Sequence, residues 1–147
     1  MMKLRMIVSA LVALAILGFA MSTQADPSCC IAGEYKTVFE DNPSPPCESP
    51  GIHQCTFIFY QNNCQPHVRA KLFDERQQLI VYVSGTLLPM RNGYKFQGTG
   101  HGAPGTYCAG ETVEIEAKFY KMNGVWHIKG KYHNPQGCSG VFEGTHM

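Results

Sequence analysis

The stretch that decides the fold spans residues 113–133 and reads VEIEAKFYKMNGVWHIKGKYH. Asn123 and Gly124 stand in its middle. Asn-Gly is the preferred pair for a two-residue type I′ turn, because that turn needs a positive φ at both positions. The segments on either side alternate apolar and charged residues, as strands do when one face is buried. The stretch therefore predicts a β-hairpin.

This turn also predicts which residues of the hairpin face each other. The apolar pairs, which we assign to the face that packs on the core, are Met122–Val125, Phe119–Ile128, Ala117–Gly130 and Ile115–Tyr132. The charged face then carries Glu116–Lys131, Glu114–His133 and Lys118–Lys129. The first two charged pairs are favourable, whereas the third sets like charges side by side. A slip of one residue would bury the charged set, so both patterns indicate the same register.

The rest of the chain repeats short runs rich in Val, Ile, Phe and Tyr, separated by turn residues, which is the pattern of strands. The predicted strands are Glu34–Phe39, Thr56–Tyr60, Val68–Phe73, Leu79–Leu88, Tyr94–Thr99, Val113–Tyr120, Val125–His133 and Gly140–Thr145. Asn92-Gly93 predicts a second type I′ hairpin. Its expected facing pairs are Arg91–Tyr94, Pro89–Phe96 and Leu87–Gly98.

The expected fold is all-β. Short connections favour sequential antiparallel pairing, and about eight such strands most simply close into a small up-and-down, lipocalin-like barrel without exposed edges. A two-sheet β-sandwich is the alternative. Eight-stranded barrels are either filled by side chains or hold one small ligand. We expect a filled interior, for which six aromatic residues are available: Phe57, Phe59, Phe96, Phe119, Trp126 and Tyr132.

Residues 1–25 have the features of a cleaved secretory signal peptide. Lys3 and Arg5 precede an apolar run, and small residues lead up to Ala25. Residues 26–147 then fold as one unit, with an irregular Pro/Cys-rich leader over 26–55 that holds one short strand, and an antiparallel β domain over 56–147. We expect a periplasmic or secreted protein that has no membrane association after cleavage.

Seven cysteines follow the signal peptide, which fits an oxidising compartment. They are Cys29, Cys30, Cys47, Cys55, Cys64, Cys108 and Cys138. Extending the 113–133 hairpin backwards brings Cys108 beside Cys138 and predicts a disulfide between them. The pairing of the other five stays open. Because seven is odd, one cysteine is free or bonds another molecule, so we expect a monomer and keep a covalent dimer as the alternative.

Charge excludes two classes of partner. Without Lys3 and Arg5, ten of the twelve Lys/Arg remain against eleven Asp/Glu. A nucleic-acid binder normally shows a basic face and an anionic-membrane binder a basic amphipathic helix, and the chain has neither pattern.

Catalytic and metal-binding signals are weak. His101, His133, Cys108 and Cys138 come toward one end of the sheet, but Cys-x2-Cys spacing is absent, so we predict no metal site and no cofactor. The run Gly98-Thr99-Gly100-His101-Gly102 lacks the following helix of a phosphate loop and is interpreted as a flexible strand-end loop. We assign no catalytic residue.

One connection, residues 62–67, reads NNCQPH and lies between two predicted strands. Over Cys64, Pro66 and His67 it resembles the Cys-x-Pro-His-x-Cys loop of the periplasmic vertebrate-lysozyme inhibitors. In that family a disulfide-closed loop carries its His into the catalytic carboxylates of the enzyme, so the resemblance implies that His67 would insert. The second loop cysteine is missing, because Val68 and Arg69 follow.

The sequence thus predicts an exported, non-enzymatic β-barrel that binds a protein or a small molecule through its loops or its mouth. The first alternative is an inhibitor of a hydrolase that uses the loop Cys64-Gln65-Pro66-His67. The second alternative is a small secreted enzyme of unrecognised type.

Overall fold

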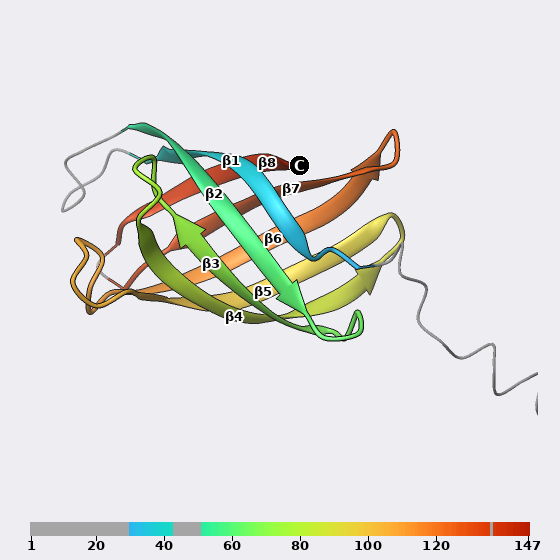
Figure 1. Ribbon diagram of the computed structural model, residues 1–147, viewed down its shortest axis with the longest axis horizontal. Helices are drawn as coiled ribbons and strands as arrows, with labels where there is room; N and C mark the ends of the chain where they lie inside the picture. Colours follow the sequence, from blue (N-terminus) through green and yellow to red (C-terminus); the bar gives the residue numbers. More distant parts are fainter. Residues whose placement is uncertain (1–29, 43–50, 136) are drawn as a thin grey trace, which may run out of the picture.

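The protein is described by a computed structural model over residues 30–42, 51–135 and 137–147. Within these residues, eight antiparallel strands close into one barrel, in which neighbours in sequence pair and β1 pairs with β8 (Figure 1). The strands are β1 (Gly33–Asp41), β2 (Ile52–Gln61), β3 (His67–Phe73), β4 (Leu79–Met90), β5 (Gly93–Gly102), β6 (Thr112–Met122), β7 (Val125–His133) and β8 (Ser139–His146). The predicted up-and-down barrel is confirmed, and its closure excludes the sandwich.

Some of the sequence predictions concern residues that the structure does not describe. The predicted signal peptide, Cys29 and Cys47 lie outside the described residues. β1 lies wholly within the leader predicted over residues 26–55, and β2 begins in it at Ile52, so this segment contributes one whole strand and the start of the next. None of the described residues forms a helix that is long and apolar enough to cross a membrane.

The hairpin of β6 and β7 has the predicted register. Asn123 and Gly124 have φ angles of 52° and 77°, as a type I′ turn requires. The outer face carries the expected ion pairs, Glu116–Lys131 at 3.5 Å and Glu114–His133 at 3.1 Å. The assignment of Met122 and Val125 to the core is wrong: both are exposed, because they stand an odd number of residues from Phe119 and Ile128 and so alternate onto the outer face.

The hairpin of β4 and β5 has a different register from the predicted one. The facing pairs are Leu87–Phe96, Leu88–Lys95 and Pro89–Tyr94. The turn residues are therefore Arg91 and Asn92, neither of which has a positive φ, so the turn is not type I′. Of the three residues Arg91, Asn92 and Gly93, only Gly93 has a positive φ, of 148°. A Cβ on Gly93 would lie 1.9 Å from the carbonyl oxygen of Phe119. A shift of two residues keeps every side chain on its own face, so alternation cannot reveal it.

Aromatic side chains fill the half of the barrel that holds the β2–β3, β4–β5 and β6–β7 turns; we call it the aromatic end. The largest fully buried side chains are Tyr35, Phe57, Phe59, Phe96, Phe119, Ile31, Ile128, Val68 and Thr37. The ring of Phe59 stands edge-on to three others, with centroid distances of 5.5 Å to Tyr35, 5.8 Å to Phe96 and 5.1 Å to Phe119. Trp126 is only partly buried, against Tyr94 at the edge of this layer.

A disulfide closes the aromatic end. Cys30, just before β1, bonds Cys64 in the β2–β3 turn. Next to it, the amide of Ile31 donates to Oε1 of Gln61 at 2.7 Å, and Ile31 is fully buried. The bridge therefore attaches the start of the described chain across the base of the barrel.

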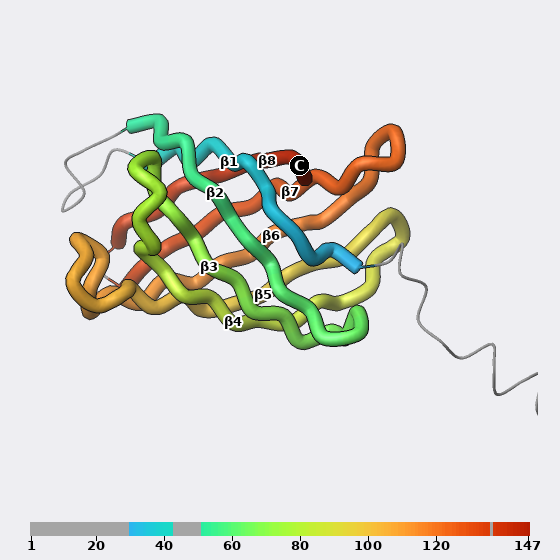
Figure 2. Tube along the Cα trace, in the orientation of Figure 1, coloured from blue at the N-terminus to red at the C-terminus, as the bar shows by residue number. Residues whose placement is uncertain are grey.

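The expected disulfide between Cys108 and Cys138 is wrong. Cys108 is a free thiol, and Cys138 is bonded in another disulfide. The reason is that β6 begins only at Thr112, so the preceding residues do not extend the hairpin. Residues 103–111 instead form a loop at the other end of the barrel (Figure 2). The amide of Ala103 donates to the carbonyl of Ile80 at 2.7 Å and so anchors this loop to β4.

Candidate binding pocket

Beyond the aromatic layer, the other half of the barrel contains a pocket of about 750 Å³. The expectation of a filled barrel is therefore wrong for this half, which we call the pocket end. Its apolar walls come from Phe39, Phe57, Leu72, Ile80, Val81, Val113 and Ile115.

β5 carries glycine at successive inward positions, where neighbouring side chains and the loop of residues 103–111 come close to its backbone. Phe96 is fully buried, and alternation places Gly98, Gly100 and Gly102 on the same inward face. The run interpreted from sequence as a flexible loop is thus the last half of a strand, and that interpretation is wrong. Glycines at alternate positions indicate a strand whose inward face is closely packed: a Cβ would lie 2.6 Å from the Phe96 ring at Gly98 and 2.6 Å from Val113 at Gly100.

The loop of residues 103–111 folds back over the end of β5. The amide of Gly102 donates to the carbonyl of Glu111 at 2.9 Å. A Cβ on Gly102 would lie 1.6 Å from the carbonyl oxygen of Cys108, so only glycine permits this close approach. The loop thereby brings Tyr107, Cys108 and Glu111 to the pocket.

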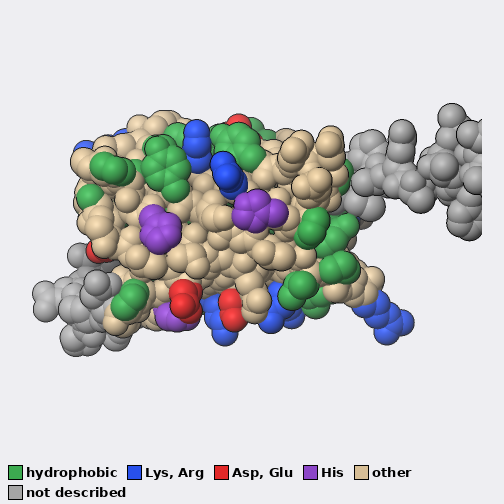
Figure 3. Space-filling view, turned by 90° about the horizontal axis from the view of Figure 1, so that it is seen from below, with side chains coloured by type: hydrophobic (Ala, Val, Ile, Leu, Met, Phe, Trp, Pro, Cys, Tyr) green, Lys and Arg blue, Asp and Glu red, His purple; other side chains and the backbone are tan. Residues whose placement is uncertain are grey.

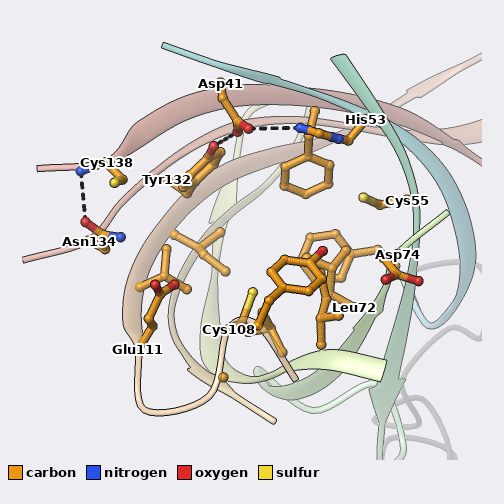
Figure 4. Close-up of a pocket in the computed structure, with 18 of the residues that line it drawn as sticks. Asp41, His53, Cys55, Leu72, Asp74, Cys108, Glu111, Tyr132, Asn134 and Cys138 are labelled. Carbon is orange, nitrogen blue, oxygen red and sulfur yellow. Dashed lines mark hydrogen bonds and ion pairs between the residues drawn. The ribbon is translucent and has the colours of Figure 1, made fainter. Parts of the chain in front are cut away.

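A hydrogen-bonded group lies on one side of the rim (Figure 4). The hydroxyl of Tyr132 donates to Oδ1 of Asp41, and Nε2 of His53 lies 3.1 Å from Oδ2 of the same carboxylate. Nδ1 of His53 lies 3.7 Å from Oε1 of Glu75. A Cβ on Gly140 would lie 2.6 Å from the Tyr132 ring, so this glycine makes room for the ring.

The rim carries more acidic than basic groups. Four carboxylates line the pocket, from Asp41, Asp74, Glu75 and Glu111, against one guanidinium, from Arg76, and the imidazole of His53. Oδ1 of Asp74 accepts from the amides of Arg76 and Gln78, both at 2.9 Å, which holds the β3–β4 turn in place.

Two free thiols point into the pocket from different sides, Cys55 from β2 and Cys108 from the loop of residues 103–111 (Figure 4). Burial raises the pKa of Cys55 to about 12 and that of Cys108 to about 11. Carboxylates, led by Glu75 for Cys55 and by Glu111 for Cys108, add to both rises. Both thiols are therefore protonated at neutral pH, and a thiol is a far weaker nucleophile than a thiolate.

The residues of the predicted binding loop lie at the opposite end of the barrel. Cys64 bonds Cys30 and not a second cysteine of its own loop. The carbonyl of Pro66 accepts from the amide of Leu87 at 2.8 Å, and His67 is exposed as the first residue of β3. The loop is therefore held by a disulfide, although not by the one that the inhibitor pattern has.

The four candidate metal ligands are not brought together. His101 is exposed on β5, His133 pairs with Glu114 on the outer face, and Cys138 is in a disulfide. In the described part of the chain, no group of three or more His, Cys, Asp or Glu side chains is arranged to hold a metal ion.

On the face seen in Figure 3, exposed hydrophobic side chains form a few small groups, with charged and polar side chains between the groups. The fold and the pocket define a small disulfide-containing β-barrel that is packed at one end and hollow at the other. Comparison of the chain with protein-family models, with curated proteins and with solved structures finds no match.

Proposed function

We propose that the protein binds a small, largely apolar ligand in the pocket end of its barrel and does not catalyse a reaction. The observation that carries this proposal is the pocket of about 750 Å³ between apolar walls and a polar rim. Small-molecule sites are typically concave and apolar, with a few polar groups that orient the ligand, and have volumes of roughly 300–1,000 Å³.

The chemistry of the pocket favours binding over covalent catalysis. A cysteine nucleophile needs a lowered pKa, usually from a neighbouring cation. The pKa values of Cys55 and Cys108 are raised instead, by burial and by carboxylates. We therefore prefer a binding protein to the secreted enzyme that the sequence left open.

Titration with a neutral, environment-sensitive naphthylamine dye tests the proposal. We expect its fluorescence to rise on binding and Val113→Trp to weaken the binding roughly tenfold or more, because the indole would occupy the pocket. Val141→Trp is the matched control, since Val141 is on the barrel exterior and 49% exposed. Equal dye binding by Val113→Trp and the wild type, with both variants folded, would refute a site in the pocket.

We also propose that the protein acts outside the reducing cytosol. The Cys30–Cys64 disulfide is compatible with an oxidising location, where such bonds persist. Mass spectrometry of the unreduced protein from cell fractions tests this. We expect a chain that begins at Asp26 and keeps its disulfides, and a reduced chain that retains Met1 in the cytosol would contradict it.

A second candidate function is the inhibition of a vertebrate-type lysozyme by the β2–β3 turn. It is favoured by the Cys30–Cys64 bond, which holds this turn, and by the exposure of His67 beside it. His67→Ala should abolish inhibition without changing the melting temperature, and His101→Ala, an exposed histidine on β5, is the control. Failure of the wild-type protein to inhibit the enzyme would exclude this function.

A further inference from the structure

We infer that the pocket selects ligands with a cationic head group on an apolar body, such as a long-chain amine. This inference rests on the proposed function and adds the chemical class of the ligand. It follows from the separation of the pocket into apolar walls within the barrel and carboxylates at the rim.

The acidic groups come from three separate connections. Asp41 ends β1, Asp74 and Glu75 form the β3–β4 turn, and Glu111 precedes β6. A ligand head group that leaves the apolar walls at this end therefore meets carboxylates from several sides. Arg76 is the one Lys or Arg side chain of the lining, and within the described residues it forms no ion pair.

The rim carboxylates also differ in how many hydrogen bonds and ion pairs they already form within the protein. Asp41 accepts from Tyr132 and contacts His53, and Asp74 accepts two backbone amides. The carboxylate of Glu111 has no hydrogen bond or ion pair within the described residues, so it is the group best able to pair with a ligand cation. An anionic head group would be repelled by the four rim carboxylates, whereas a cationic one would be attracted.

The direction of the pKa shifts of the two thiols agrees with this acidic surrounding. After burial, the largest causes of the raised pKa of Cys55 are Glu75 and Asp74, and those of Cys108 are Glu111 and Asp74. The same carboxylates that disfavour a thiolate at these two positions would disfavour any anionic ligand and stabilise a cationic one.

A matched series of decylamine, decanol and decanoate, each competing with the neutral dye below its micelle concentration, tests the inference. We expect the amine to displace the dye at roughly one tenth of the concentration that the alcohol needs, and the carboxylate to need the most. The preference for the amine should shrink in about 0.5 M NaCl, which screens exposed charges.

Glu111→Gln should reduce about threefold the ratio of the alcohol concentration to the amine concentration that displaces the dye. Glu114→Gln, on the outer face of β6, is the control and should leave both unchanged. An amine that binds no better than the alcohol, or a carboxylate that binds best, overturns this inference and leaves the proposed function standing. If the dye and all three compounds fail to bind, the proposed function fails and the inference with it.

Discussion

At the scale of the residue, Tyr35 shows how burial couples a side chain to pH. Its ring is fully buried, and its hydroxyl donates to the carbonyl of Ile31 at 2.7 Å. Tyr35→Phe leaves this carbonyl without its partner, so we expect it to lower the free energy of unfolding by about 1–2 kcal/mol at neutral pH. Urea unfolding checks the value, and Tyr60→Phe, at an exposed tyrosine, is the control.

The effect of Tyr35→Phe should shrink in alkali. Burial raises the pKa of Tyr35 well above its ordinary value, so the unfolded chain releases this proton first and the wild type loses stability as pH rises through about 10. The variant has no such proton to lose. By about pH 11 the difference between the two should fall by about 1.4 kcal/mol. If the stability difference between the wild type and Tyr35→Phe did not depend on pH, the raised pKa of Tyr35 would be contradicted. The raised pKa values of Cys55 and Cys108 also lower the free energy of unfolding above about pH 9. They do so equally in the wild type and in Tyr35→Phe, so they cancel from the difference.

At the scale of the element, β5, β6 and β7 align three lysines on the outer face. Lys118 faces Lys95 on one side and Lys129 on the other. Lys118→Glu replaces two repulsive cross-strand pairs by two attractive ones, so we expect it to raise the free energy of unfolding by about 0.5–1.5 kcal/mol. Urea unfolding at low and high salt measures the gain, which salt should reduce. Lys131→Glu is the control and should destabilise the protein, because it sets a second carboxylate opposite Glu116.

The end of β5 supplies a second prediction at this scale. Gly102→Ala should displace the loop of residues 103–111, because the new methyl group would lie 1.6 Å from the carbonyl oxygen of Cys108. We expect roughly tenfold weaker dye binding and a more reactive Cys108 thiol, with the barrel retained. Gly105→Ala is the matched control: it has open space but a φ of 77°, so it should cost about 1 kcal/mol of stability and leave dye binding unchanged. Unchanged affinity in Gly102→Ala would show that the loop is not part of the site.

At the scale of the whole molecule, we expect the aromatic end of the barrel to stabilise the fold and the pocket end to bind the ligand. The Cys30–Cys64 bond joins residues 34 apart at the aromatic end, far from the pocket rim. The double variant Cys30→Ala/Cys64→Ala should lower the free energy of unfolding by about 3–4 kcal/mol, the loss of a cross-link over such a loop. Dye affinity should stay within about twofold wherever the variant is folded, because distant sites act independently. Parallel loss of folding stability and of affinity in the folded state would show that the ends are coupled.

The hairpin of residues 113–133 was predictable because its information is local. Asn123-Gly124 has one favoured turn, and the alternation of apolar and charged residues agrees with it. The hairpin of β4 and β5 was predicted in the wrong register, because a two-residue shift preserves the alternation and the position of Gly93 is decided by its approach to Phe119 on β6. Of the candidate site, the sequence indicates Cys55 only as a disulfide candidate and Cys108 as a disulfide candidate and one of four weighed metal ligands, and it gives no signal for the rim carboxylates.

The sequence by itself determined the all-β class and the number and order of the strands, because period-two patterning and turn residues act between neighbours. The closure of the barrel, which pairs β1 with β8, was decided by the tertiary structure. Only the tertiary structure decided that the barrel is filled at one end and hollow at the other. A cavity is the space left by inward side chains from all the strands together, and no single strand shows it. The free state of Cys108 was decided in the same way, by a loop whose path depends on its anchor at Ile80 as well as on its own turns.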